Sequence, residues 1–139
     1  MGSGKKFASR EAKLACSSEE FYGFITDMRN FAKILPAGVS RWTADETSCR
    51  FSISPLGETG LKIISRSPYS SVKFEGAVLV SNTFQLDVMI SDGGSGKASA
   101  ELFMEADLNP VIAAMAAGPI EKFLETLVTE MEKYKGWTE

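Results

Sequence analysis

Polar and apolar residues follow two different periods along the chain, and the change between them predicts a sheet flanked by helices. From residue 39 to residue 108, apolar side chains recur at every second position, in segments separated by the turn sequences PLGETG, SPYS and DGGSG. A period of two is typical of strands that bury one face. The pattern predicts six antiparallel strands over residues 39–45, 48–54, 61–67, 71–78, 83–91 and 97–107.

The alternation also assigns each side chain to one face of this sheet. The expected buried face consists of Phe51, Ile53, Leu61, Ile63, Val72, Phe74, Phe84, Leu86, Val88, Ile90, Ala100, Leu102 and Met104. The expected wet face consists of Arg50, Ser52, Lys62, Arg66, Lys73, Glu75, Gln85, Asp87, Ser99, Glu101 and Glu105. Because an antiparallel sheet with a single apolar face needs a cover, we expect the helices at the two ends of the chain to lie on it.

The segment before the sheet predicts a strand followed by two short helices. Residues 7–16 alternate weakly and end at Ser17, which forms an S-x-x-E capping box with Glu20. The helix that follows carries an apolar stripe at i, i+3, i+4 and i+7: Phe21, Phe24, Ile25 and Met28. Asp27 is a second N-cap, and Pro36 ends the second helix. Residues 1–6 resemble an expression tag and are expected to lie, disordered, outside a single domain of residues 7–139.

The C-terminal segment predicts a long helix that is broken near its middle. Asn109 is the expected N-cap and Pro110 the first helical residue. The second half has one apolar stripe, formed by Ile120, Phe123, Leu124, Leu127, Val128 and Met131. Between the halves, Pro119 costs about 3 kcal/mol in a helix interior and Gly118 about 1 kcal/mol more. We therefore expect a bend at this point.

The first half of this helix is made mostly of alanine and is apolar on all sides. If the helix is bent, its short side chains leave volume unfilled between helix and sheet, and that volume is a candidate binding site. In the alternative interpretation, the alanines allow close packing on the sheet and the bend has no function, since well-packed cores are the norm. The pattern of residues does not choose between the two.

Composition and charge narrow the range of functions. The chain has 139 residues, a net charge of -3 and scattered Lys and Arg, so the clustered positive charge of a nucleic-acid-binding protein is missing. The longest apolar stretch, residues 111–120, contains Gly-Pro and is half the length of a membrane span, which needs about 20 residues. Cys16 and Cys49 are far apart and are expected to be buried free thiols, which favours a cytoplasmic protein.

Candidate catalytic groups are few. The chain contains no histidine, which excludes His-based triads and His metal sites, and two isolated cysteines make no zinc site. If residues 92–96 form a five-residue hairpin loop, Asp87 falls opposite Glu101, and two neighbouring carboxylates raise one pKa as a general acid requires. The stronger interpretation is a solvated pair with Lys73 and Lys62 nearby. We therefore expect no metal and no cofactor, and the pattern favours a protein that is not an enzyme.

Four polar side chains are candidates for the mouth of a cavity. They are Arg10, Asp27, Asn30 and Ser65. The alternative is that such residues cap helices or satisfy stray backbone groups, which is the commoner role of buried or half-buried polar side chains.

Three stretches of the sequence resemble a known family. SSEEFYGFITDMRNFAKILP, WTADETSCRFSI and ADLNPVIAAMAAGPIEKFLETL are similar to segments of small single-domain bacterial members of the SRPBCC superfamily, which includes START, Bet v 1-like and polyketide cyclase proteins. The resemblance implies an α+β helix-grip fold. In that fold a seven-stranded curved antiparallel sheet wraps around the C-terminal helix, with two short helices between the first two strands and an apolar cavity inside. Fold alone does not choose among the activities of such a group.

The function expected from these observations is binding of a small lipid-like or aromatic molecule between sheet and helix. The candidate lining residues are Met28, Trp42, Phe51, Ile53, Ile63, Phe74, Phe84, Leu86, Val88, Ala100, Leu102, Met104, Ile112, Met115, Ala116 and Phe123. For an individual residue plain core is the favoured interpretation, and only their collective arrangement under the bent helix favours a cavity lining. One alternative is a cyclase or dehydratase that uses a carboxylate or Tyr22 as acid. Another is a protein-interaction domain in which the apolar residues 111–117 bind a partner or a second copy of the chain.

Overall fold

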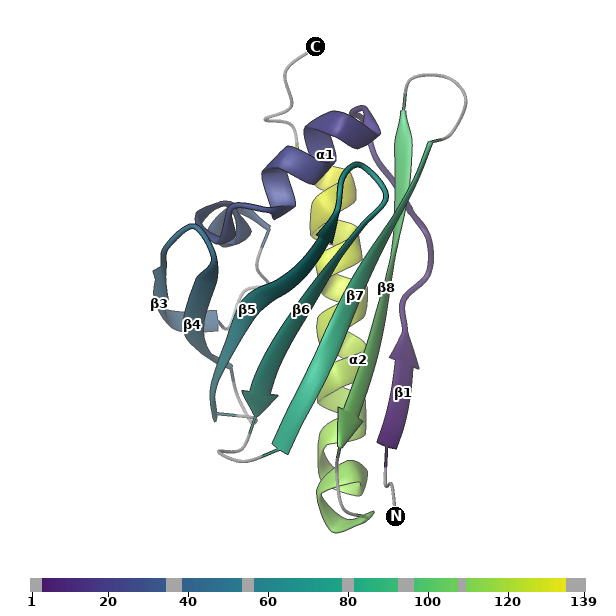
Figure 1. Ribbon diagram of the computed structural model, residues 1–139. Coiled ribbons are helices and arrows are strands. Elements are labelled where there is room, and N and C mark those ends of the chain that lie inside the picture. The colour runs from purple at the N-terminus through teal and green to yellow at the C-terminus, as the bar shows by residue number, and fades with distance from the viewer. Residues whose placement is uncertain are drawn as a thin grey trace.

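A single antiparallel sheet forms one layer of the molecule and a long helix lies across its inner face (Figure 1). The computed structural model describes residues 4–34, 39–53, 57–78, 82–92, 97–107 and 110–134. The strands are β1 (Gly4–Ala8), β2 (Ala12–Lys13), β3 (Val39–Ala44), β4 (Ser48–Ile53), β5 (Gly57–Ser67), β6 (Ser71–Val78), β7 (Asn82–Asp92) and β8 (Ala98–Asp107). Their order is β1-β8-β7-β6-β5-β4-β3, and β2 also pairs with β8. The expected α+β architecture is confirmed.

The first expected strand is divided into two pieces that pair with the same neighbour. Ala8 lies opposite Phe103 and Ala12 opposite Ala100, so three residues between these pairs on one side face two on the other. The extra residue lets Arg10 turn away from the ladder. β1 also begins at Gly4, so residues 4–6 belong to the sheet, and the expectation that they lie outside the domain is wrong.

Two short helices follow the first strands, as predicted. α1 (Ser18–Ile25) is capped by Ser17, whose hydroxyl accepts a hydrogen bond from the backbone N–H of Glu20 at 3.1 Å. The second, η1 (Met28–Lys33), is a 3-10 helix capped by Asp27. Its expected stop, Pro36, lies outside the described residues. Together the two helices cover one end of the space between the sheet and the C-terminal helix (Figure 1).

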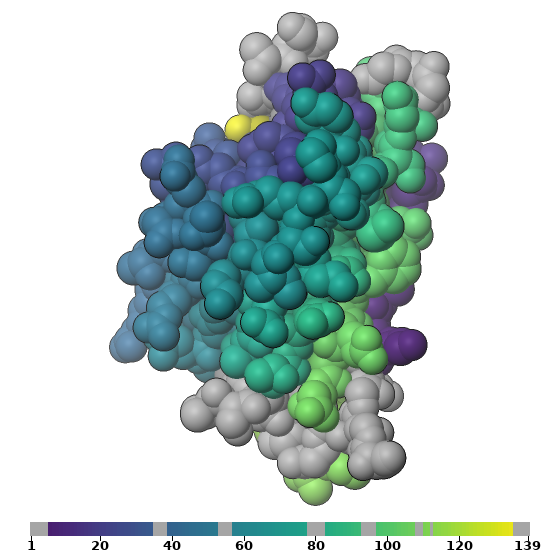
Figure 2. Space-filling view, in the orientation of Figure 1, coloured from purple at the N-terminus to yellow at the C-terminus, as the bar shows by residue number. Residues whose placement is uncertain are grey.

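Alternation of side chains gives the sheet one buried face and one solvated face. All of the described side chains predicted for the apolar face are buried except Ile63, which is half-buried beside a register shift in β5. Ser99, predicted for the wet face, is nevertheless only 8% exposed, and its hydroxyl donates a hydrogen bond to Glu11. Figure 2 shows the outer face of β5 to β8, with α1 above it.

The C-terminal helix, α2 (Pro110–Lys133), stays helical through Gly118 and Pro119. Its predicted N-cap, Asn109, lies outside the described residues, and the expected bend stays a prediction. The apolar stripe of the second half is buried: Ile120, Leu124, Leu127, Val128 and Met131. Phe123 is half-buried at the edge of the stripe. The opposite side, which includes Glu121 and Lys122, is exposed, so the second half of α2 lies on the sheet as its sequence predicts.

Candidate functional site

The interface between α2 and the sheet is not uniform. Among the described residues, Cα atoms of α2 approach Cα atoms of β1, β2 and β8 within 8 Å, and approach none in β3 to β7 that closely. The helix therefore lies nearest the β1–β8 side. Towards β3 to β7, the interval between helix and strand backbones is wider and must be bridged by longer side chains.

An ion-pair cluster ties α2 to the β1–β8 side. The Arg10 guanidinium donates to Glu125 and to Glu132 at 3.0 Å each, and to the Thr129 hydroxyl at 3.2 Å. The same Glu132 oxygen accepts the backbone N–H of Lys13 at 2.8 Å. These two donors, Arg10 first, hold the pKa of Glu132 below its ordinary value. Arg10, which lies between β1 and β2, and the backbone of Lys13 in β2 thus attach this side of the sheet to the helix.

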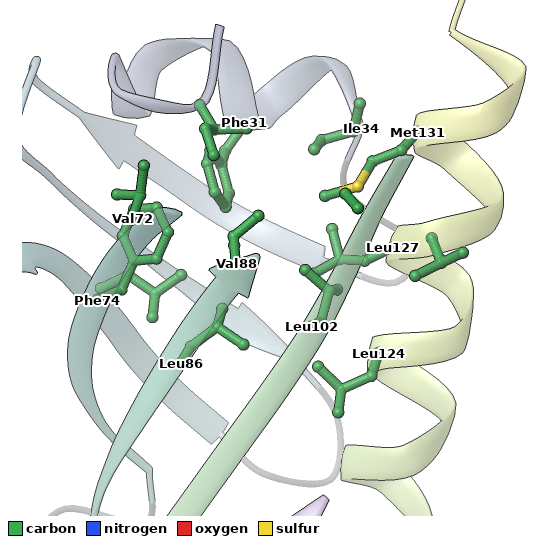
Figure 3. Close-up of a cluster of buried hydrophobic side chains, with 14 of the residues drawn as sticks. Phe31, Ile34, Val72, Phe74, Leu86, Val88, Leu102, Leu124, Leu127 and Met131 are labelled. Carbon is green, nitrogen blue, oxygen red and sulfur yellow. The ribbon is translucent and has the colours of Figure 1, made fainter. Parts of the chain in front are cut away.

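One part of the interior is a closed apolar core. Sheet residues Val72, Phe74, Leu86, Val88 and Leu102 point toward Leu124, Leu127 and Met131 of α2, with Phe31 and Ile34 closing one side (Figure 3). Each of these ten side chains is 1% exposed or less. Phe31 and Phe74 meet edge to face, with ring centroids 5.6 Å apart and planes at 68°.

A second part of the interior is spanned by a row of three aromatic rings, which we call the aromatic row: Trp42, Phe51 and Phe123. Trp42 of β3 and Phe51 of β4 have ring centroids 5.9 Å apart and planes at 31°. Phe51 and Phe123 of α2 are 6.1 Å apart, with planes at 16°. Phe51 is buried, whereas the two end members are only half-buried. The row joins the β3–β4 edge to α2 where their backbones are far apart.

Most of the predicted lining residues lie where the sequence places them. Ten are buried: Met28, Phe51, Phe74, Phe84, Leu86, Val88, Ala100, Leu102, Met104 and Ala116. Trp42, Ile63 and Phe123 are half-buried against that core. The side chains of Ile53 and Ile112 lie outside the described part of the chain. These residues therefore lie together in the core between the sheet and the helices. Their role in binding stays a prediction.

Met115 does not lie inside. Its side chain is 54% exposed, and Val111, one turn earlier, is 76% exposed. The buried positions of this helix include Ala116, Ile120 and Leu124, and a rotation of 100° per residue turns Met115 away from that face. The first turns of α2 also project past the end of β8 (Figure 1). Met115 is thus displaced from the predicted lining, and the first half of α2 is only partly covered.

The predicted pair of carboxylates does not form. Asp87 lies opposite Phe103, and Glu101 lies opposite Met89. Asp92 pairs with Ala98, whereas the expected loop pairs Ser91 with Lys97, so each residue of β7 lies opposite a residue of β8 two positions later than expected. Asp87 faces Lys73 across the strands, with 3.9 Å between Oδ1 and Nζ, on the outer face of the sheet. This is the solvated pairing that the sequence favoured.

The other polar candidates serve the fold. Asp27 caps η1 and binds Arg29 at 2.6 Å, which is the main reason that the pKa of Asp27 lies below its ordinary value. The Asn30 amide donates to the Phe24 carbonyl at 3.0 Å, and Ser65 is exposed on β5. Tyr22, the acid considered for an enzyme, packs edge to face on Tyr69, with ring centroids 5.4 Å apart.

The sequence did not identify the contacts of Arg10 with Glu125, Thr129 and Glu132, which we call the Arg10 clamp. Its signal is present in the helix: Glu125, Thr129 and Glu132 stand at i, i+4 and i+7 and so share one polar side. The sequence did not predict the break between β1 and β2. This break directs the Arg10 guanidinium toward the polar side of α2.

Both cysteines are buried free thiols, as predicted. Burial raises the pKa of Cys16 to about 12, with a smaller contribution from Glu20, and burial also raises the pKa of Cys49 to about 12. At neutral pH both are therefore protonated and poor nucleophiles.

A hollow of about 780 Å³ lies on the outer face of the sheet. It forms where Gly60 and Ala77 stand side by side on β5 and β6 and leave the surface without long side chains. Its rim mixes Arg50 and Lys62 with Glu58 and Glu75, so no one sign of charge dominates it.

Among the described helices, none combines the length and the hydropathy that crossing a bilayer requires.

Solved structures of known proteins share this architecture. A protein from Mycobacterium smegmatis superposes with a TM-score of 0.72 at 8% identity, over 96% of this chain and 93% of its own. A conserved protein from Geobacillus kaustophilus gives 0.68 at 12%, over 94% and 92%. Norcoclaurine synthase from Thalictrum flavum, solved in complex with dopamine and hydroxybenzaldehyde, gives 0.67 at 12%, over 97% and 90%.

No protein-family model matches the sequence, and no curated protein matches it either. The structural likeness, at identities of 8 to 12%, shows the fold. The chain has the helix-grip fold, which is the fold that the sequence resemblance implied.

Proposed function

We propose that this domain binds a small apolar molecule between α2 and the β3–β4 side of its sheet. The observation that carries the proposal is the aromatic row, whose outer members are half-buried where helix and sheet backbones are far apart. Burying an apolar guest there yields about 25 cal/mol per Å² of area removed from water. The proposal needs no catalytic group.

Two further features support this location. The region around Leu124, Leu127 and Met131 is filled by its own side chains, so a guest fits better beside Phe123. The Arg10 clamp holds α2 at the β1–β8 side of the sheet. The backbone of α2 therefore lies farther from the backbones of β3 and β4. Structurally similar proteins include an enzyme solved with two small aromatic molecules, which is compatible with a binding role for the fold.

Native mass spectrometry of protein purified from its own host tests the proposal. We expect a population that carries a non-covalent small molecule, released on denaturation. Adding the extracted molecule to protein made in another host should raise the melting temperature in a concentration-dependent way, since a ligand that binds only the folded state stabilises it. Host-purified protein that carries no molecule, together with no stabilisation by apolar compounds, would contradict the proposal.

A second candidate function is self-association through the start of α2. Val111 is 76% exposed and Met115 54% exposed, one turn apart on the same side of the helix. Exposed apolar side chains that gather on one surface are typical of interaction sites. Sedimentation equilibrium of the native chain and of a Val111→Ser, Met115→Ser variant decides this candidate: a dimer that the double substitution dissociates supports it, and a monomer in both excludes it.

A further inference from the structure

We propose that the hollow on the outer face of the sheet binds a small zwitterion, a molecule that carries a carboxylate at one end and an ammonium group at the other. The hollow measures about 780 Å³, within the range of about 300 to 1,000 Å³ that is typical of small-molecule sites. It lies on the face of the sheet opposite to the proposed apolar site. The inference therefore goes beyond the proposed function and does not depend on it.

Gly60 lies in the middle of the hollow, and four charged residues surround it. Lys62 and Glu58 stand two positions away from it on either side along β5. Arg50 of β4 lies directly opposite Gly60, and Glu75 of β6 lies opposite Lys62. Because alternate residues of a strand and directly opposed residues of two strands share a face, all four side chains leave the same outer face.

Short side chains form the floor of the hollow. Ala77 of β6 lies opposite Gly60, and Thr83 of β7 lies opposite Ala77. A Cβ at Gly60 would be 2.9 Å from the Cys49 carbonyl oxygen, so the backbone leaves no room for a side chain at this position. The chain that joins the two charges of a ligand can therefore lie directly against the sheet.

The four charged side chains are exposed and have no ion-pair partner within the described ranges. This holds even for Lys62 and Glu75, which lie opposite each other on neighbouring strands. On the same face, Lys73 and Asp87 also lie opposite each other and do form an ion pair, at 3.9 Å. The charges around the hollow are therefore available to a ligand.

The presence of both signs of charge selects the class of ligand. A simple anion is attracted by the two cations and repelled by the two carboxylates, and a simple cation meets the reverse, so the two effects oppose each other. A zwitterion can place each of its charges beside the opposite one. Since Glu58 and Lys62 are four residues apart on one strand, about 13 Å at about 3.3 Å per residue, the two charges of the ligand must also be separated. An extended ω-amino acid meets this requirement.

The test is an NMR titration that follows the backbone amide of Gly60. The probes are 6-aminohexanoate, hexanoate and hexylamine, which have the same six-carbon chain and carry both charges, the anion alone or the cation alone. We expect 6-aminohexanoate to bind about 1.4- to 5-fold more tightly than either of the others, which corresponds to one exposed ion pair. High salt should remove the difference, because exposed charges are screened.

Two double variants assign the two ends of the ligand. An Arg50→Gln, Lys62→Gln variant should lose the advantage of 6-aminohexanoate over hexylamine, since hexylamine has no carboxylate. A Glu58→Gln, Glu75→Gln variant should lose the advantage of 6-aminohexanoate over hexanoate, which has no ammonium group. Lys73→Gln is the matched control: Lys73 lies on the same face but does not line the hollow, and neither advantage should change.

A third variant fills the hollow. Ala77→Leu adds a larger side chain to its floor and should weaken the binding of all three probes. Ala8→Leu adds the same side chain to the outer face of β1, outside this hollow, and should leave their binding unchanged.

The outcomes decide the inference independently of the apolar site. If 6-aminohexanoate binds no more tightly than hexanoate or hexylamine, or does not shift the Gly60 amide, the inference is overturned. If its advantage persists in both double variants, or if Ala77→Leu leaves its binding unchanged, the molecule binds elsewhere and the inference is overturned as well. Neither result bears on the proposed function, which native mass spectrometry tests separately.

Discussion

Arg10 and Glu132 lie 122 positions apart in the chain, yet Nη1 of the first is 3.0 Å from Oε2 of the second. The pair joins the break between β1 and β2 to the last turns of α2, and Glu125 and Thr129 complete the set of acceptors. Since, in the described segments, the backbone of α2 approaches that of the sheet closely on this side alone, the clamp contributes to the position of the helix across the interface.

We expect loss of the clamp to lower stability slightly and to loosen the attachment of α2. Arg10→Met and Glu132→Gln should each reduce the melting temperature by a few degrees at most, since exposed ion pairs are screened by water and salt. In a double-mutant cycle the two changes should be less than additive, because either one removes the shared contact. The control is Lys13→Met: its Nζ lies 3.6 Å from Glu11 with the Lys13 side chain 80% exposed, and we expect no measurable effect. Additive effects at Arg10 and Glu132 would contradict the clamp.

The clamp also predicts how stability changes in acid. The pKa of Glu132 lies below its ordinary value because Arg10, and then the Lys13 backbone N–H, stabilise the carboxylate. Its contribution is therefore present above the pKa of the unfolded chain, near 4.5, and is lost as pH falls through the lower folded value. Urea midpoints measured between pH 6 and pH 3 should decline less steeply in Glu132→Gln than in the native chain. If the urea midpoints of the variant and the native chain decline equally, the pKa of Glu132 is the same in the folded and the unfolded state.

Gly118→Ala should stabilise the protein. Gly118 lies within α2, and a methyl group added there meets nothing within 4 Å. Replacing a helical glycine by alanine ordinarily gains about 0.5 to 1 kcal/mol in the free energy of unfolding. Because a Cβ on the residue before a proline disfavours helical backbone, the gain at Gly118, which precedes Pro119, should be smaller. Gly23→Ala in α1 is the control, with the same open surroundings, no proline after it and the full expected gain.

The opposite result is expected at Gly76, where an added methyl group would collide with the Gly60 carbonyl and lie 2.7 Å from the Phe84 ring. Chemical denaturation of the three variants measures all of these effects. If Gly23→Ala stabilises and Gly118→Ala destabilises, the side chain placed before Pro119 strains the helix by more than the alanine contributes.

The two thiols should be unreactive until the protein unfolds. With a pKa of about 12 for Cys16 and for Cys49, only about one thiol in 10⁴ is ionised at pH 8, and the thiolate is the reactive form. Disulfide reagents should therefore label both cysteines in denaturant and, in the native state, only at a rate at least about 100-fold slower. Fast labelling of either thiol in the native state would contradict its burial.

The same groups predict a loss of stability in alkali. Because the folded-state pKa values are raised, the unfolded chain loses these protons first as pH rises above about 9, and the unfolded state gains in stability up to about pH 12. A Cys16→Ala, Cys49→Ala variant should show a shallower decline of the urea midpoint between pH 9 and pH 10.5 than the native chain. Equal slopes would show that the thiols do not contribute.

The sequence by itself determined the local elements and the faces they bury. The period of two from residue 39 onward sets which strand residues face inward, and Phe74, Leu86 and Leu102 are buried as expected because neighbouring side chains must alternate. Ser17 and Asp27 cap their helices because short polar side chains satisfy free backbone N–H groups over a few residues. Such effects act within one turn or one strand, so a single sequence is enough to reveal them.

Only the tertiary structure decided which distant side chains meet. A shift of register moved Asp87 away from Glu101, and one extra residue between β1 and β2 turned Arg10 onto α2, though neither changes the local pattern of residues. Trp42, Phe51 and Phe123 each read as ordinary apolar positions in the sequence. They form one row because the sheet curves around the helix and brings β3, β4 and α2 together, and that relationship depends on the packing of the whole chain.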